Sequence, residues 1–375
     1  MAPKGPAAAP PGRQARNIPG KDSDFPMKTY GVVLIGCGHI GCEHLADIYF
    51  RPGIRIVAVV DTDLAKAEQA RRRYAAAYCG ADYRPFLERE DVEIVIIATN
   101  VDSHLAILRD CVRAGKHVLC EKPIAGSREE GRAFYECARN APVQVSVAHI
   151  LRYNETYRRA RELIASGAIG QLKVVRMVQN HHSKDWPRYR RLLEDCSPVL
   201  DCGVHYFDVL QWFSGSPITR VSGIGAAVDP DLPAGVLNYG MVQLHTQSGV
   251  VGYYEAGWGR GFCSSNVKEF VGTQGHLTLT LRDFRTSHRE EGDLIELFRQ
   301  ETGEYRAINV EGEYKPMWRQ LSALIRRIEG KTSEMPPLAD LYSAFLVGLA
   351  ADEAIRIGEI RVPELPPAEE KRAVS

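Results

Sequence analysis

The first half of the chain alternates short apolar runs with longer amphipathic segments. From Tyr30 onward, runs rich in Val, Ile and Leu predict strands buried on both faces, at 32–35, 54–60, 94–98, 117–120 and 143–148. The segments between them predict helices, at 40–49, 63–77, 103–115 and 127–140. Strands that alternate with helices form βαβ units, so we expect a doubly wound, mainly parallel sheet.

The second half of the chain has a different pattern. After one helix at 157–166, β-rich runs separated by short turns predict strands at 173–179, 219–223, 236–246, 249–255, 268–272 and 275–281. Two helical stretches follow, at 317–329 and 338–357. A run of strands of this kind is typical of a mainly antiparallel sheet. The fold class is therefore predicted to be α/β, with an α/β domain followed by an α+β domain.

Three regions follow from these patterns. Residues 1–26 hold six prolines, five alanines and three glycines without an apolar period, which favours a disordered extension covering 1–28. The doubly wound domain is predicted at 29–150 and the α+β domain at 151–375. A length of 375 residues is ample for two domains with cores of their own.

Composition and charge exclude several classes of protein. With 45% hydrophobic and 25% charged residues, the chain is an ordinary globular one. The 47 basic residues balance 47 acidic residues, which argues against a nucleic-acid binder and against a polybasic membrane protein. No apolar run reaches the roughly 20 residues that span a bilayer.

The nine cysteines form no Cys-x-x-Cys pair and no cluster with histidine. This spacing argues against a structural metal site and is typical of free thiols in a reducing compartment. We therefore expect a cytoplasmic protein without a bound metal.

A glycine-rich turn follows the first predicted strand and opens the first predicted helix. It reads Gly36-Cys37-Gly38-His39-Ile40-Gly41, the pattern G-x-G-x-x-G. In that context the first glycine permits the turn, the second lets backbone approach a pyrophosphate, and the third lets helix and strand pack closely. The pyrophosphate would bind backbone N–H groups at the helix start, near His39 and Ile40.

Asp61 follows the second strand, 20 residues after Gly41. A carboxylate at this point accepts hydrogen bonds from ribose hydroxyls and repels a 2′-phosphate. No arginine adjoins Asp61, because Thr62 and Asp63 come next. The sequence therefore predicts NAD as the cofactor in preference to NADP. The alternative is a glycine turn in an α/β fold that binds no nucleotide.

Glu121-Lys122-Pro123 lies at the carboxyl end of the fifth strand, the edge where open α/β sheets bind their ligands. The ammonium of Lys122 can hold an alcohol oxygen as negative charge builds on it. The alternative is a solvated lysine. The Lys122–Pro123 bond is a candidate cis peptide.

Asp201, His205 and Asp208 are spaced i, i+4 and i+7 within an apolar segment that runs to Phe213. On a single helix they would share one face, with Asp201 near its start. A carboxylate one turn from an imidazole can orient it, and histidine titrates where a general base for an alcohol is needed. The alternative is a core histidine with a capping aspartate.

These motifs together resemble the Gfo/Idh/MocA oxidoreductase family over residues 29–360. The resemblance rests on GCGHIG, Asp61, the segment His117 to Pro123 and Asp201-x-Gly203-x-His205-x-x-Asp208. It implies an NAD-binding Rossmann domain and an α/β domain with a large open sheet that mediates homodimers or homotetramers. It also implies oxidation or reduction of a secondary alcohol on a sugar, a cyclitol or a related compound.

The resemblance also implies site residues. Lys122, Asp201 and His205 would be the catalytic set, with His205 as the acid/base. Thr99, Asn100 and His104 stand where the family has a cofactor-binding segment with a frequent Thr-Pro, and Glu121 precedes the lysine. Substrate contacts would come from Arg152 and Tyr153, together with Asp201 and His205.

The order of the elements places other residues near the predicted pocket. His181, His182 and Trp186 follow one strand, and Trp258 and Arg260 close another. Of these, Trp186 is predicted to contact the substrate. Before the aspartate motif, Cys196-Ser197-Pro198 replaces a glycine pair frequent in the family, which stiffens that loop.

The combined prediction is an NAD-dependent dehydrogenase that transfers hydride from a polyol or sugar. Two alternatives stay open at this point. One is a redox-assisted lyase or glycosidase, in which NAD is reduced and regenerated within one turnover. The other is a nucleotide-binding regulator without catalysis, against which the presence of Lys122 and His205 counts.

Overall fold

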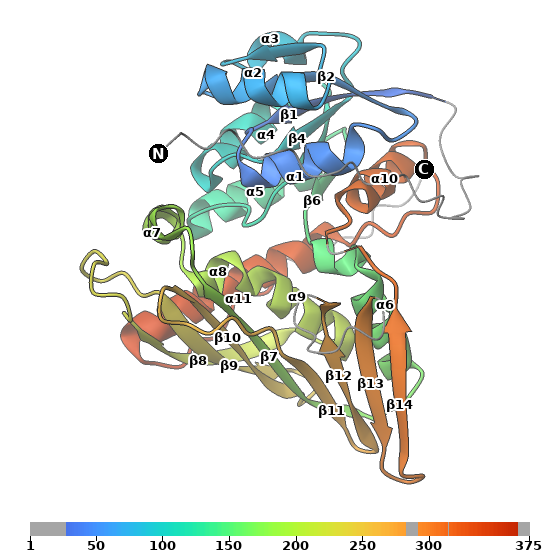
Figure 1. The fold of residues 1–375 in the computed structure, drawn as a ribbon, viewed down its shortest axis with the longest axis vertical. Helices are drawn as coiled ribbons and strands as arrows, with labels where there is room; N and C mark the ends of the chain where they lie inside the picture. Colours follow the sequence, from blue (N-terminus) through green and yellow to red (C-terminus); the bar gives the residue numbers. More distant parts are fainter. Residues whose placement is uncertain (1–27, 283–291, 314, 367–375) are drawn as a thin grey trace, which may run out of the picture.

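The computed structural model describes residues 28–282, 292–313 and 315–366, which form two sheets (Figure 1). The first is a six-stranded parallel sheet in the order β3-β2-β1-β4-β5-β6. The second has eight strands in the order β14-β13-β12-β11-β7-β10-β9-β8 and is antiparallel except for the pair β7–β10. The predicted fold class is confirmed. All but Lys28 of the predicted extension at 1–28 lies outside the described residues.

The first domain follows the predicted βαβ alternation. Its elements are β1 (Tyr30–Ile35), α1 (His39–Ile48), β2 (Ile54–Val60), α2 (Leu64–Arg73), β3 (Tyr78–Gly80), α3 (Arg84–Leu87), β4 (Ile94–Ile97), η2 (Val101–Ser103), α4 (His104–Arg113), β5 (His117–Cys120), α5 (Arg128–Asn140) and β6 (Val145–Val147). All four residues of β4 are fully buried, as expected for a strand covered on both faces. The short elements β3 and α3 were not predicted, because so few residues carry no period.

The second domain is built around the eight-stranded sheet. Its elements are η3 (Ile150–Tyr153), α6 (Glu155–Ala165), β7 (Leu172–His182), α7 (Trp186–Asp195), α8 (Pro198–Asp201), α9 (Gly203–Ser214), β8 (Ile218–Ala226), β9 (Tyr239–Thr246), β10 (Val251–Gly259), β11 (Lys268–Gly272), β12 (Gly275–Thr280), β13 (Asp293–Arg299) and β14 (Glu304–Val310). The helices α10 (Met317–Ile328) and α11 (Leu338–Ile357) follow.

One face of this sheet is covered by α6, α9 and α11, as Figure 1 shows, and the inward side chains of the strands form one core with these helices. Strands β13 and β14 were not predicted. In β13 only Ile295 and Leu297 are buried, and β14 is an edge strand whose residues are mostly exposed. An edge strand of this kind carries too few apolar residues to show a period.

The last two helices return to the first domain and hold the two domains together. Leu321, Leu324 and Ile325 of α10 join the core around β1 and α1. Tyr342 of α11 stacks on Tyr135 of α5, with ring centroids 4.4 Å apart. No helix in the described ranges is long and apolar enough to cross a membrane.

Candidate active site

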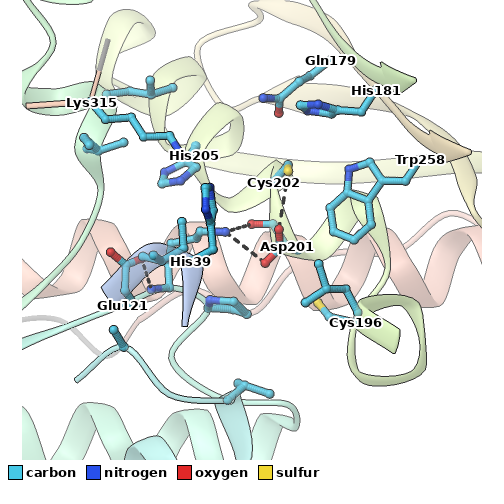
Figure 2. Close-up of a pocket in the computed structure, with 18 of the residues that line it drawn as sticks. His39, Glu121, Gln179, His181, Cys196, Asp201, Cys202, His205, Trp258 and Lys315 are labelled. Atoms are coloured by element: carbon cyan, nitrogen blue, oxygen red, sulfur yellow. Dashed lines mark hydrogen bonds and ion pairs between the residues drawn. The ribbon is translucent and has the colours of Figure 1, made fainter. Parts of the chain in front are cut away.

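A cavity of about 440 Å³ lies between the two domains. The first domain contributes the start of α1 and the carboxyl ends of β4 and β5, and the second contributes α7, α8, α9 and the sheet (Figure 2). Of the site residues predicted from the sequence, the following line the cavity: Gly38, His39, Ile40, Thr99, Asn100, His104, Glu121, Lys122, Asp201 and His205. The cavity thus joins groups from distant parts of the sequence.

The glycine turn has the shape that a dinucleotide site requires. Gly36 has a φ of +98°, and a Cβ there would meet the Ala98 oxygen at 2.4 Å. A Cβ on Gly41 would meet the Gly36 oxygen at 1.9 Å, so only glycine lets α1 pack this closely. Nothing lies within 4 Å of the Cβ position of Gly38, which faces the cavity. Backbone is therefore open to a ligand at the start of α1, and the residues present fit the diphosphate of NAD.

Asp61 lies beside this turn rather than in the cavity lining. Its Oδ2 accepts a hydrogen bond from the Cys37 N–H at 2.8 Å, and its Oδ1 accepts one from the Asp63 N–H at 2.9 Å. The carboxylate is thus held at the end of β2, next to the glycine turn. A second carboxylate, that of Asp63, accepts from the Ala65 N–H at the start of α2.

Lys122 and Asp201 form an ion pair across the two domains. The Lys122 Nζ donates to Asp201 Oδ1 at 3.0 Å and to the Asp201 backbone oxygen at 2.9 Å, shown as dashed lines in Figure 2. Burial alone would lower the pKa of Lys122, but the Asp201 carboxylate outweighs burial and raises it above its ordinary value. Lys122 is therefore a fixed positive charge in the cavity. The Lys122–Pro123 peptide is cis, as the sequence suggested.

The single helix predicted from Asp201 onward is wrong. Asp201 ends α8, and α9 begins at Gly203, with Cys202 as its N-cap. Helix α8 has its own start, because the Ser197 hydroxyl accepts from the Leu200 N–H at 3.0 Å. The break lets Asp201 turn to Lys122 instead of lying one turn from His205 on a shared face. The alternative of a capping Asp201 is contradicted, because the N-caps of α8 and α9 are Ser197 and Cys202.

His205 lines the cavity from the first turn of α9. Its Nδ1 is buried without a hydrogen-bond partner among the described residues. Burial lowers the pKa of His205 well below its ordinary value, and the positive charges of Lys122, His149 and Lys315 lower it further. Its imidazole is therefore neutral at neutral pH and able to take up a proton.

Asp208 is a buried residue of α9 outside the cavity lining. Its two carboxylate oxygens accept from Arg152 Nε at 2.8 Å and Nη2 at 2.7 Å. His149 lies 3.5 Å from the same carboxylate and packs edge-on against the His205 ring. Arg152, predicted as a substrate contact, is outside the cavity lining and instead supports α9.

Two further pairs position the cofactor side of the cavity. The Nε2 of His44 in α1 lies 2.8 Å from Glu121 Oε1. Burial alone would raise the pKa of Glu121, but this bond and the charges of His44 and Lys122 outweigh burial and lower it. His104 lies between the backbone oxygens of Pro123 at 3.1 Å and Thr99 at 3.2 Å. The two contacts of His104 connect the turn after β4 with the turn after β5.

The comparisons with known proteins agree with this geometry. Residues 30–149 match the family described as "Oxidoreductase family, NAD-binding Rossmann fold", and residues 157–278 match the "GFO/IDH/MocA C-terminal domain". The chain belongs to the Gfo/Idh/MocA family. It is thus an oxidoreductase with an NAD-binding Rossmann domain.

Relatives in the Gfo/Idh/MocA family include inositol dehydrogenases. The inositol 2-dehydrogenase of Rubrobacter xylanophilus is 27% identical over 339 residues, which cover 87% of this chain and 91% of that protein. The scyllo-inositol 2-dehydrogenase (NAD(+)) of Bacillus subtilis is 26% identical over 253 residues, covering 66% and 73%.

Solved structures of the Gfo/Idh/MocA type share the fold. A levoglucosan dehydrogenase in complex with NADH and L-sorbose superposes with a TM-score of 0.76 at 22% identity, covering 91% of this chain and all of that one. The myo-inositol 2-dehydrogenase of Lactobacillus plantarum gives a TM-score of 0.76 at 18% identity, covering 90% and 100%.

The cavity lining also contains buried polar atoms without partners in the described part of the chain, three of them on residues outside the family motifs. Four buried side-chain atoms in its lining have no hydrogen-bond partner among the described residues: Gln179 Oε1, His205 Nδ1, Trp258 Nε1 and Asn266 Oδ1. Figure 2 shows Gln179, His181 and Trp258 on the wall formed by the sheet. The sequence signals for this wall were the alternation of Gln179 and His181 at the end of one predicted strand and the position of Trp258 at the end of another.

Several expected contacts lie elsewhere. Tyr153, the last residue of η3, is buried, and Trp186 packs with Leu193 while its Nε1 donates to Asp231 at 2.9 Å. Arg260 pairs with Asp229 and Asp231, and its guanidinium lies over the Trp186 ring. His181 and Trp258 line the cavity, whereas these three residues and His182 do not. Within the described residues no group of three or more His, Cys, Asp or Glu is placed to hold a metal.

Proposed function

We propose that this protein oxidises a secondary alcohol of a sugar, a cyclitol or a sugar derivative, with NAD as hydride acceptor. One observation carries the proposal. Lys122 from the first domain and His205 from the second line the same cavity, next to the open backbone of Gly38. The similarity to inositol 2-dehydrogenases supports the substrate class.

In this mechanism His205 removes the proton of the reacting hydroxyl. Its low pKa keeps the imidazole neutral and ready to accept that proton. Two N–H groups of the Lys122 ammonium are engaged by Asp201, which leaves a third to stabilise the negative charge on the substrate oxygen. Asp201 orients that ammonium. Bound NAD supplies the hydride-accepting ring.

The remaining hydroxyls of the substrate would meet the sheet wall. Gln179 and Asn266 offer carbonyl oxygens as acceptors, and Trp258 offers an N–H as donor. Unpaired polar atoms in a buried wall are unfavourable until a ligand satisfies them. A polyhydroxylated ring has the donors and acceptors to do so.

NAD is proposed in preference to NADP. The Asp61 carboxylate is held next to the glycine turn by two backbone N–H groups. The neighbouring carboxylate of Asp63 pairs with Lys66 Nζ at 3.5 Å, so the preference for NAD rests on Asp61 alone. No basic side chain forms an ion pair with Asp61 among the described residues.

The direct test follows NADH formation at its absorbance band with a panel of cyclitols, aldoses and sugar acids, together with analysis of the products. We expect stoichiometric NADH and ketone from at least one polyol. Cleavage of a substrate that requires bound NAD but yields no net NADH would contradict the proposal and support the lyase or glycosidase alternative.

We also propose that copies of the chain associate through the outer face of the eight-stranded sheet, as a homodimer or homotetramer. In the described ranges α6, α9 and α11 cover only the inner face. Light scattering of the purified protein tests this, and a monomer at micromolar concentration would contradict it.

A further inference from the structure

Arg188 is a cation in the cavity wall that the proposed mechanism does not use. It lies in the first turn of α7, is half-buried and lines the cavity. Among the described residues no carboxylate pairs with it, although Arg190 on the same helix pairs with Glu194. A half-buried guanidinium without a counter-charge is unfavourable unless a ligand supplies one.

Lys315 lines the same cavity from the segment between β14 and α10. Figure 2 shows its side chain extending towards His205, on the side of the cavity opposite Trp258. Burial lowers the pKa of Lys315; the carboxylates of Glu43 and Glu121 oppose this effect, and the charges of Lys122 and Arg188 add to it. Lys122 and Arg188 are thus each close enough to Lys315 to repel its charge.

The two cations of the second domain also act on the start of α1. Burial lowers the pKa of His39, and the positive charges of Arg188 and Lys315 lower it further. The first turn of α1 contains no acidic residue, and its N-cap, Gly38, provides no side-chain hydrogen bond. A helix start adds its own positive potential. Three sources of positive charge therefore converge on this end of the cavity.

Three carboxylates of the lining have partners of their own. Glu121 is bonded to His44, Asp201 to Lys122, and Asp293 accepts from the Thr156 hydroxyl at 2.6 Å and the Arg282 N–H at 2.8 Å. The fourth, Asp195, has a pKa raised by burial and by the charges of Asp102 and Glu194. None of these acids forms an ion pair with Arg188 in the described ranges.

We infer that Arg188 and Lys315 together form an anion-recognition subsite between the domains, which holds a carboxylate or phosphate group of a bound ligand. The inference rests on the proposed function and deepens it. Guanidinium and ammonium groups bind such anions through charge-assisted hydrogen bonds. The anion belongs either to the diphosphate of the dinucleotide, clamped from the second domain, or to an acidic substituent on the substrate.

Binding measurements on the full chain distinguish these two sources. The variants are Arg188→Gln, Lys315→Gln and the double variant, and Arg191→Gln is the matched control because Arg191 is an exposed residue of the same helix. One arm measures the Kd of NADH by fluorescence. The other measures, with NADH bound, the Kd values of D-glucose and D-glucuronate, which differ by one carboxylate.

A diphosphate clamp raises the Kd of NADH by about tenfold or more in the double variant and weakens its dependence on salt. A substrate-anion site leaves the Kd of NADH unchanged, and the double variant loses a preference of the wild-type protein for glucuronate over glucose. Arg191→Gln changes neither value.

Two results overturn the inference. One is a double variant that matches the wild-type protein in NADH affinity and in its preference between the two sugars. The other is an equal effect of Arg191→Gln, which would reduce the result to general surface charge. Failure of the wild-type protein to bind NADH at all would instead refute the proposed function, and the subsite would fall with it.

Discussion

The two domains bury different kinds of residue behind the same cavity. The central strands of the first domain are mostly apolar, and Val32, Val33 and Leu34 of β1 are fully buried. The second-domain sheet buries a lysine: Lys268 of β11 is 0% exposed, donates to the Val178 oxygen at 3.3 Å and lies over the Tyr206 ring. The first domain thus supports the cofactor site with an apolar core, whereas the second domain buries polar groups in the sheet beside the substrate site.

The same division applies to the reacting groups. Lys122 comes from the first domain and His205 from the second. Loss of either group is expected to slow the chemistry without unfolding the domain that supplies it. Substitutions in the first and in the second domain therefore test the roles of Lys122 and His205 separately.

The largest effect is expected in the second domain, from His205→Ala. Without its base the reaction should slow by about 10²–10⁴-fold in kcat, the usual contribution of a positioned acid/base group. The Kd of NADH should stay within about twofold, because His205 is proposed to touch substrate and not the dinucleotide's phosphates. Full turnover in this variant would remove His205 from the mechanism.

Lys122→Met in the first domain should reduce kcat by about 10²–10³-fold, as for loss of one group that stabilises an oxyanion. It should also move the acid limb of the kcat/KM profile to higher pH. The Lys122 charge helps to lower the pKa of His205, so the variant imidazole becomes protonated at a higher pH than in the wild-type protein. An acid limb that does not move would contradict the proximity of the two groups.

Lys268→Met tests the buried polarity of the second domain. Burial lowers the pKa of Lys268 from 10.5 to about 7 in the folded protein. Between these values the unfolded chain binds more protons, so the free energy of unfolding rises with pH, by at most about 1.4 kcal/mol per pH unit. Below about pH 7 both states are protonated and the slope vanishes.

Urea unfolding of the wild-type protein and the variant across that pH range measures the difference. We expect Lys268→Met to be the more stable protein near neutral pH and to show the smaller gain as pH rises. Glu269→Gln, on the outward side of β11 where Glu269 pairs with Arg176, is the control and should keep the wild-type slope. Identical slopes in Lys268→Met and the wild-type protein would contradict a buried neutral amine.

The smallest effect is expected from Asp61→Ser, at the edge of the first domain. Removing the carboxylate should reduce the preference for NAD over NADP by about tenfold, the value of one lost charge interaction with ribose or phosphate. The ratio of kcat/KM for the two cofactors measures it. A ratio equal to that of the wild-type protein would end the assignment of Asp61 to the ribose.

The comparison also explains what the sequence could predict. Elements with a local signal were predicted well: β2, β5 and β11 have the predicted bounds, and the glycine turn lies between β1 and α1. Lys122 and His205 were predicted from motifs and line the cavity. Local sequence carries this information because strand burial and turn geometry act over a few residues.

Apart from the meeting of Lys122 and His205, contacts between distant segments were not predicted correctly. Asp201 was expected to orient His205. Because the helix breaks before α9, the Asp201 carboxylate instead pairs with Lys122, 79 residues away. Arg152 was assigned to the substrate, whereas Asp208 binds it outside the cavity lining. Arg188 and Lys315 enter the cavity from α7 and from the segment before α10, and neither belongs to a pattern. Only the folded arrangement brings such residues together.

The central claim is that the Lys122 ammonium and the His205 imidazole act on one substrate oxygen in one transition state. A double-mutant cycle on kcat for NADH formation, with Lys122→Met, His205→Ala and the combined variant, tests it most directly. Because residues that act as a unit are strongly non-additive, we expect the combined variant to be little slower than the slower single variant. Losses that multiply would show that the two groups act independently and would contradict the account.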